Sequence, residues 1–348
     1  MERSCVSRTG GIVVLLLLLH GCTGNDVAGL DDFDEGLRLL EQSRHEGALL
    51  AFDRALVSRP DDPRIHYQRG VTLHGLAARH QGGLTKEGDQ LLSQANAAYA
   101  RAVDLGSKDA RAYYRLGLIN TGGGYSEETL QLMDRALELD PQYVEAHYDR
   151  ARALSAVGRT TEALQAFDRT VALKPDFARA HMRRASLLSQ LDRPEDALAA
   201  HDRAIELAPN DSKVHFNRGR TLASLDRHGE ALKAHTRATE LWSAFGGAHW
   251  GRGEALEAIG RHEEALEAYE RAERLDGYGR TVEPEANTNY MGSLLKARLL
   301  VRMGRFEDAL KAFDAVLGTQ PEREDIKQER LRAASMRRGP VRPDASSE

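Results

Sequence analysis

A pattern of small, large and proline positions recurs every 34 residues between Val144 and Phe245, without insertions. In each copy, histidine, a small residue and leucine stand at i, i+4 and i+7, as in His147, Ala151 and Leu154. This spacing places the three side chains on one face of a helix. A second set of small and large residues follows, and proline ends the first two copies, where it stops the helix. The pattern therefore predicts stacked pairs of helices, each of which buries its apolar face against its neighbours.

Position in the copy determines residue size. The eighth position is glycine or alanine and the twentieth is alanine, as in Ala151 and Ala163, so the two helix backbones can approach closely. The twenty-fourth position is large, and Phe167 is expected to fill the space between units. Each copy should therefore fold as helix, turn, helix, turn.

This pattern resembles the tetratricopeptide repeat (TPR), and the resemblance covers most of the chain. It implies an all-α fold, a right-handed α-solenoid of about eight TPR repeats over residues 29–323. A C-terminal capping helix is expected at 324–338. The repeats are expected to start near residues 29, 63, 110, 144, 178, 212, 246 and 290.

Two insertions interrupt the repeat frame, at about residues 80–92 and 277–289. The first should extend both helices of its hairpin by about two turns, and Thr85 is the expected N-cap of the second of these helices. The second contains glycines and a proline and is expected as an exposed loop between repeats. Residues 339–348 are expected to be a disordered tail.

The N-terminus has the features of an export signal over residues 1–21. Arginines precede an apolar run of eight residues, which is too short for a bilayer span of about 20. Residues 19–22 resemble the lipobox of bacterial lipoproteins, which implies lipid attachment at Cys22 and a short tether over residues 22–28. The alternative is an ordinary secretory signal followed by a chance cysteine. In the lipoprotein interpretation, Thr23 after the lipidated cysteine favours the outer membrane, with the protein facing the periplasm.

Charge and cysteine content agree with an exported chain. The sequence holds two cysteines, and Cys5 would leave with the signal, so the mature chain could form no disulfide within itself. Removal of residues 1–21 changes the formal net charge from −5 to about −6. A chain without net positive charge is a poor candidate for nucleic-acid binding.

The thirteen histidines raise the question of a metal site. Equivalent histidines in successive repeats should lie about 10 Å apart, whereas zinc ligands lie within about 2.1 Å of the ion. Adjacent repeats could bring together a pair such as His201 and His215, but packing of the imidazoles in the repeat core is favoured. We expect no metal and no cofactor.

Catalytic motifs are also missing. His45 and His262 are each followed by glutamate, but leucine stands where the second histidine of a zinc protease motif belongs. No set of nucleophile, base and orienting residue clusters in the sequence. The chain is therefore not expected to be an enzyme, and no catalytic residue is assigned.

A ladder of arginines occupies the seventh position of the repeats, and aspartates follow the large residue at the twenty-fourth position. The arginines are Arg69, Arg150, Arg184, Arg218 and Arg252, and the aspartates are Asp53, Asp134, Asp168 and Asp202. We expect salt bridges between adjacent repeats. If these pairs are partly buried, deletion of one partner should cost several kcal/mol, roughly 3 to 5.

The second, fifth and ninth positions of the first helix share a face beside the packed one. In TPR proteins these positions line the concave ligand groove. The resemblance therefore implies a ligand groove formed by Tyr114, Tyr148, Met182, Phe216, Trp250, Arg111, Arg152, Arg179, Lys213 and Arg220. Tyr67 and Arg64 occupy equivalent positions nearer the N-terminus, and Glu145 and Glu254 are acidic exceptions.

An aromatic and basic groove suits a protein or peptide segment that carries carboxylates. We expect a membrane-anchored scaffold or adaptor of the bacterial cell envelope, similar to TPR lipoproteins of envelope assembly and pilus biogenesis. The alternatives are a regulatory docking subunit of an envelope enzyme, such as one that remodels peptidoglycan, and a secretion or pilus assembly factor. The sequence indicates no oligomeric state.

Overall fold

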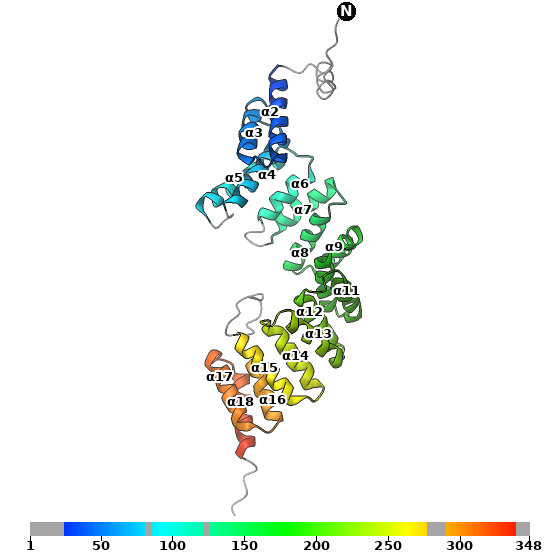
Figure 1. Cartoon of the computed structure of the whole chain (residues 1–348), viewed down its shortest axis with the longest axis vertical. Coiled ribbons are helices and arrows are strands. Elements are labelled where there is room, and N and C mark those ends of the chain that lie inside the picture. Colours follow the sequence, from blue (N-terminus) through cyan, green and yellow to red (C-terminus); the bar gives the residue numbers. More distant parts are fainter. Residues whose placement is uncertain (1–23, 81–84, 121–124, 277–289, 339–348) are drawn as a thin grey trace, which may run out of the picture. The chain divides into compact units, whose positions relative to one another are not determined.

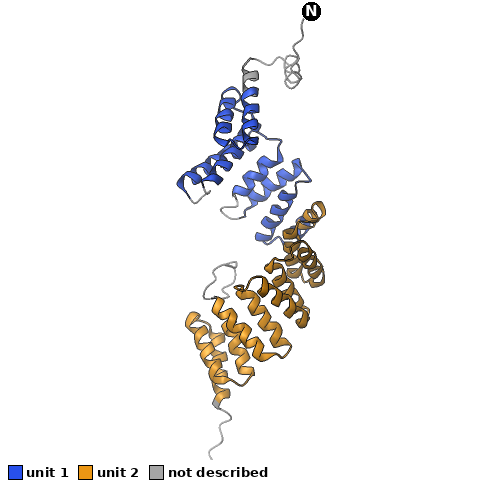
Figure 2. Cartoon of the chain, in the orientation of Figure 1, with its two compact units in different colours: residues 1–166 blue, residues 167–348 orange. Residues whose placement is uncertain are grey.

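A computed structural model describes residues 24–80, 85–120, 125–276 and 290–338. These residues form seventeen α-helices and no strand, as expected for an all-α solenoid of helix pairs (Figure 1). The chain divides into two compact units, residues 1–166 and 167–348 (Figure 2). Each unit is described by itself.

Unit 1 consists of consecutive helix pairs in which each helix packs on the next. Its helices are α2 (Gly24–Glu41), α3 (His45–Ser58), α4 (Pro63–Arg79), α5 (Lys86–Asp104), α6 (Ala110–Asn120), α7 (Glu127–Leu139) and α8 (Val144–Ala156). Helix α9 (Thr160–Leu173) crosses the division between the units.

Unit 2 continues the same alternation. Its helices are α10 (Ala178–Gln190), α11 (Pro194–Leu207), α12 (Ser212–Ser224), α13 (His228–Leu241), α14 (Gly246–Ala258), α15 (His262–Asp276), α16 (Met291–Arg302), α17 (Phe306–Thr319) and α18 (Glu324–Arg338). The first helices α10, α12 and α14 also contact one another in sequence, which makes them one continuous layer.

Two features differ from the expected repeat frame: the start of helix α2 and the lengths of helices α4 and α5. Helix α2 begins at Gly24, so residues 24–28 of the expected tether are helical. Helices α4 and α5 have 17 and 19 residues, against 13 and 14 in the pair α10 and α11. The first insertion therefore lengthens each helix by about one turn, not the expected two.

Polar caps fix several of these helix starts. The hydroxyl of Thr85 accepts a hydrogen bond from the Gly88 backbone N–H at 3.0 Å, so the predicted cap of α5 is confirmed. Ser126 caps α7 and Asp211 caps α12 in the same manner, through side-chain oxygens that accept from backbone N–H groups.

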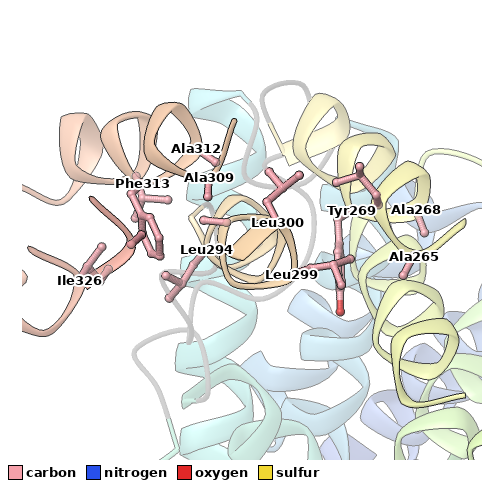
Figure 3. Close-up of a cluster of buried hydrophobic side chains, with 14 of the residues drawn as sticks. Ala265, Ala268, Tyr269, Leu294, Leu299, Leu300, Ala309, Ala312, Phe313 and Ile326 are labelled. Carbon is pink, nitrogen blue, oxygen red and sulfur yellow. The ribbon is translucent and has the colours of Figure 1, made fainter. Parts of the chain in front are cut away.

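The core of unit 2 near its C-terminal end is a continuous apolar cluster across five helices, α14 to α18. Leu294, Leu299 and Leu300 of α16 lie between Tyr269 of α15 and Phe313 of α17 (Figure 3). The buried Ile326 joins the same cluster from α18. Helix α18 therefore covers the last complete pair with a short apolar face, while its other side carries charged residues.

The expected ladder of arginine and aspartate pairs is present. Nε–H of the arginine donates to the aspartate 16 residues earlier, at 2.5 to 2.7 Å; the pairs are Arg69 with Asp53, Arg150 with Asp134, Arg184 with Asp168, and Arg218 with Asp202. The sequence reading missed a further pair in the same register, Arg330 with Asp314. This pair shows that α18 docks as the first helix of another repeat.

Residues 1–23, 277–289 and 339–348 lie outside the described part of the chain. The predictions of a signal, of lipid attachment at Cys22, of an exposed second insertion and of a disordered tail therefore concern residues that the structure does not describe. Within the described helices, none combines the length and the apolar character that a membrane span requires.

Candidate functional site

The second, fifth and ninth positions of the first helices lie beside the face that packs against the second helices. We call the residues at these positions the first-helix surface of each unit. In unit 1 it comprises Arg64, Tyr67, Arg111, Tyr114, Glu145, Tyr148 and Arg152; in unit 2 it comprises Arg179, Met182, Lys213, Phe216, Arg220, Trp250 and Glu254.

In unit 1 the tyrosines of this surface are packed rather than free. Tyr67 and Tyr114 are only 5% and 8% exposed. The Tyr114 hydroxyl donates a hydrogen bond to the buried carboxylate of Asp149 at 2.9 Å, and its ring lies 4.8 Å from that of Tyr143. Burial and the adjacent Asp149 raise the pKa of Tyr114, so its phenol is neutral at physiological pH. A ligand can therefore reach mainly the edges of these two rings.

The arginines of unit 1 are held by neighbouring carboxylates. Arg111 donates through Nε and Nη2 to Asp109 at 2.6 to 3.2 Å, and its guanidinium lies 5.3 Å from the Tyr67 ring centroid. Arg64 binds Asp62 in the same way. The sequence contained a signal for both pairs, because aspartate stands two residues before each arginine.

Arg152 is held by a different carboxylate, that of Asp149. Its Nη1 donates to Asp149 Oδ1 at 2.8 Å, and its guanidinium lies 5.9 Å from the Tyr148 ring centroid. Asp149 thus receives one hydrogen bond from Arg152 and one from Tyr114, which satisfies a carboxylate that is nearly inaccessible to water. Sequence reasoning missed Asp149, which points inward from α8.

In unit 2 the fifth positions are half-buried. The Phe216 ring contacts Phe245, with centroids 4.9 Å apart, and Arg220 lies 5.9 Å from the Phe216 centroid. Trp250 packs against the buried cluster of α15 and α16. The exposed parts of Met182 and Phe216 remain available to a ligand.

The basic residues of unit 2 differ from those of unit 1. Arg179, Lys213 and Arg220 are exposed, and no carboxylate oxygen of the described residues lies within 4.0 Å of their cationic groups. Asp211 accepts from the backbone N–H of Lys213, at 2.9 Å, and not from its ammonium group. These three residues form an unneutralised basic area on α10 and α12.

Glu254 marks the end of that basic area on α14. It is exposed, yet the surrounding helices crowd its carboxyl and reduce its hydration, which raises its pKa, while Arg220 acts in the opposite direction. The first-helix surface of unit 2 therefore runs from positive on α10 and α12 to acidic on α14.

The histidines at the fourth position have a structural role. In His66, His147, His181, His215 and His249, Nε2 lies 2.7 to 3.0 Å from the carbonyl oxygen six residues earlier. A carbonyl can only accept, so each imidazole donates its Nε2–H and ties the first helix to the preceding turn. His201 and His235 are buried in the core instead, and burial lowers the pKa of each to about 4.

Among the described residues, no group of three or more histidine, cysteine or acidic side chains is placed to hold a metal ion. A pocket of about 290 Å³ between α15, α16 and α17 contains Glu270, Glu273 and Lys296. Lys296 donates to Glu273 at 2.9 Å, so these charges stabilise the junction between repeats.

Comparison with protein families gives one assignment across most of the chain. The model of a family described as tetratricopeptide repeat matches residues 33–92, 87–144, 148–212, 214–280 and 294–337. No curated protein matches the chain.

Several solved structures are similar to parts of this chain. The chain is similar to PilW, described as a widely conserved type IV pilus biogenesis factor, with 17% identity and a TM-score of 0.55 over 63% of this chain and 97% of PilW. It is also similar to YrrB, described as a TPR protein with an unusual peptide-binding site, with 25% identity and a TM-score of 0.47 over 52% of this chain and 93% of YrrB. Yeast Tom70 matches at 17% identity and a TM-score of 0.46, over 89% of this chain and 65% of Tom70.

Proposed function

Because the chain belongs to the tetratricopeptide repeat family, we propose that it is a scaffold or adaptor that binds a protein segment on the first-helix surface. Proteins built from TPR repeats mediate interactions between proteins. The observation that carries the proposal is the separation of roles along each first helix. The fourth, seventh and eighth positions hold the repeats together, whereas Arg179, Lys213 and Arg220 at second and ninth positions are exposed and the fifth positions of unit 2 are only half-buried.

The proposed cellular setting is the bacterial envelope. An apolar run of eight residues followed by a lipobox-like segment supports export and lipid attachment at Cys22. With helix α2 starting at Gly24, the repeats would begin directly beside the membrane. We propose an outer-membrane location that faces the periplasm, from the identity of Thr23.

The proposed role is that of a binding protein rather than an enzyme, because tetratricopeptide repeat proteins generally serve as interaction scaffolds. A regulatory docking subunit of an envelope enzyme remains the second form of the same proposal. Co-purification of an enzymatic activity with the captured partner would distinguish this form from a passive assembly scaffold.

The proposal is tested by crosslinking in intact cells followed by purification of the chain from membranes. The comparison includes Cys22→Ser and the double variant Met182→Ala/Phe216→Ala, with circular dichroism as the check on folding. We expect a defined partner that the double variant fails to capture, and release of Cys22→Ser from the membrane fraction. If the double variant captures the partner as well as the original chain does, the first-helix surface of unit 2 is not the binding site. If Cys22→Ser stays in the membrane fraction, lipid attachment at Cys22 is contradicted.

A further inference from the structure

His235 of α13 lies between the backbones of two first helices. A Cβ atom added to Gly219 of α12 would stand 2.6 Å from Cε1 of the imidazole, and a Cβ atom added to Gly251 of α14 would stand at the same distance. Side-chain carbons do not approach that closely, so the ring fits because both residues are glycine. The ring is 1% exposed, and its centroid lies 5.5 Å from that of Phe216. His235 therefore connects α14 to the preceding repeat.

This connection differs from the equivalent ones at the sixth position of the repeat. Gly251 is the sixth residue of its repeat, and the other repeats carry a larger residue there; these are Asp34, Gln68, Arg115, Asp149, Arg183, Asn217 and Leu295. The contact of a bare first-helix backbone with the large residue of the preceding repeat is therefore particular to α13 and α14. We call His235, Gly219 and Gly251 the histidine joint.

Helix α14 depends on this packing, because its own sequence favours helix only weakly. Glycine is among the poorest helix formers, and four of the 13 residues of α14 are glycine; these are Gly246, Gly247, Gly251 and Gly253. Phe245, at the N-cap position, gives no side-chain hydrogen bond to the start of the helix. Ser243 stands where the turns before α10 and α12 carry proline, so the φ angle of this turn is not fixed. Contacts with neighbouring helices are therefore the main source of stability for α14.

A proton on His235 is incompatible with this packing. Nδ1 of His235 is buried and has no hydrogen-bond partner among the residues that the structure describes. A neutral imidazole can leave Nδ1 without a proton, whereas the imidazolium ion carries an N–H at both nitrogens and a full charge. Within the joint, the second N–H would lack an acceptor and the charge would lack water. Burial, together with the positive charge of Arg220 on α12, lowers the pKa of His235 to about 4.

The other titratable groups of α14 act in both directions. His249 is buried, which lowers its pKa, so its protonation also favours an open α14. Burial raises the pKa of Glu254, so acid favours the folded state at this residue and offsets part of the effect. Arg252, whose Nε is buried, adds positive charge. The remaining titratable residues of α12, α13 and α14 are exposed or have partners outside the joint; they are Lys213, His215, Arg218, His228, Glu230, Lys233, Arg237, Glu240 and Glu257.

We propose that the histidine joint is acid-sensitive: when His235 takes up a proton, α14 separates from α12 and α13 and unwinds, while helix pairs farther along the stack stay folded. Repeats contact only their neighbours, so one weakened joint can open without loss of the whole fold. The opening removes Trp250 and Glu254 from the first-helix surface of unit 2, so acid would alter any binding that uses α14. The inference goes beyond the proposed function and does not depend on it, because it concerns the packing of three helices.

The test is hydrogen–deuterium exchange of the purified full chain, measured by mass spectrometry at pH 7 and at pH 5. Each exchange rate is compared with the intrinsic rate at the same pH, which gives a protection factor that reports local opening. We expect α14 to lose protection at pH 5, whereas α16 and α17, which contain no histidine, keep theirs.

His235→Phe and His235→Met remove the titratable group while they keep a large side chain. Both have a precedent in the chain, because Phe52 lies against Gly36 and Met133 lies against Gly117. The fall in α14 protection between pH 7 and pH 5 should be about 20-fold smaller in either variant, the factor that a pKa change from 6.5 to about 4 gives over this range. His201→Phe is the control, because it removes the buried imidazole of the preceding repeat and should leave the α14 response in place.

Two results would overturn the inference. The first is a fall in α14 protection that is the same in the original chain and in the variants of His235; if one variant does not fold at pH 7, the other decides. The second is an equal loss of protection in α14, α16 and α17, which would mean that acid unfolds the stack as a whole. The measurement needs no partner, so its failure leaves the proposed function standing, and a failure to capture a partner leaves the acid-sensitive joint standing.

Discussion

A Cβ atom on Gly253 would lie 2.5 Å from Cε1 of Tyr269, closer than two such carbon atoms can approach. The same relation joins the eighth and twenty-fourth positions in other repeats; the pairs are Gly36 with Phe52, Gly70 with Tyr99, Gly117 with Met133, and Gly219 with His235. The large side chain of the second helix therefore occupies the space that a side chain on the glycine of the first helix would need.

This relation predicts that Gly253→Ala destabilises the protein although alanine favours helix. The methyl group must displace the buried Tyr269 ring, and overpacking of this kind costs about 1 to 3 kcal/mol. Gly229 in α13 is the control, because a Cβ atom there would contact nothing within 4 Å. Gly229→Ala should leave the free energy of unfolding unchanged or raise it by up to about 1 kcal/mol. Urea unfolding followed by circular dichroism measures both, and equal effects would contradict the packing argument.

The ladder of arginine and aspartate pairs predicts a stabilising substitution. Nε of Arg252 is buried and has no hydrogen-bond partner among the described residues, because Thr236 stands where the other repeats carry aspartate. Thr236→Asp should restore the pair and raise the free energy of unfolding by about 0.5 to 1 kcal/mol, with a smaller gain at high salt. Thr236→Asn is the neutral control of similar shape, and an equal gain from asparagine would show that charge is not the cause.

The same ladder shows what the sequence could predict. The 34-residue spacing was sufficient to pair Arg218 with Asp202, because any stack of such repeats brings these positions together. The spacing did not determine how exposed to solvent the two side chains of each pair are. The aspartate side chains are 45% to 51% exposed, so each pair is expected to contribute about 1 kcal/mol or less, and the expected cost of several kcal/mol is too large.

The candidate site shows the same limit. The repeat frame assigned Tyr114 and Phe216 to equivalent positions, but it could not indicate that Tyr114 is buried against Asp149 while Phe216 stays partly exposed. That difference depends on side chains of neighbouring helices, such as Tyr143. The neutralisation of Arg111 was readable from the local order of Asp109 and Arg111; the neutralisation of Arg152 by an inward-facing aspartate one turn away was not.

The hydrogen bond between Tyr114 and Asp149 predicts a structural role for this tyrosine. Tyr114→Phe removes one donor from a buried carboxylate, which should lower the free energy of unfolding by about 1 to 3 kcal/mol. A double-mutant cycle with Asp149→Asn isolates the contribution of this contact from that of Arg152. A coupling energy near zero would contradict the assignment, and an undiminished affinity of Tyr114→Phe for the partner segment would place Tyr114 outside the binding contacts.

The buried histidines of unit 2 predict a loss of stability in mild acid. His201 and His235 are each 1% exposed, and burial lowers their pKa from the ordinary 6.5 to about 4. The unfolded chain therefore binds more protons than the folded chain between pH 6.5 and pH 4, so the free energy of unfolding falls as the pH drops through this window. At pH 5 each histidine should account for a loss of about 2 kcal/mol relative to pH 7.

His201→Phe tests this prediction. The last repeat already carries phenylalanine, Phe313, at the position equivalent to His201, and both repeats have alanine at the eighth position. Denaturant unfolding measures the free energy of unfolding at pH 7 and at pH 5. The decrease between these two pH values should be about 2 kcal/mol smaller in the variant than in the original chain. His235→Phe should act similarly, because the new phenylalanine ring would lie against Gly219 as Phe52 lies against Gly36. If both variants keep the pH dependence of the original chain, the acid sensitivity arises elsewhere in the protein and not from these two imidazoles.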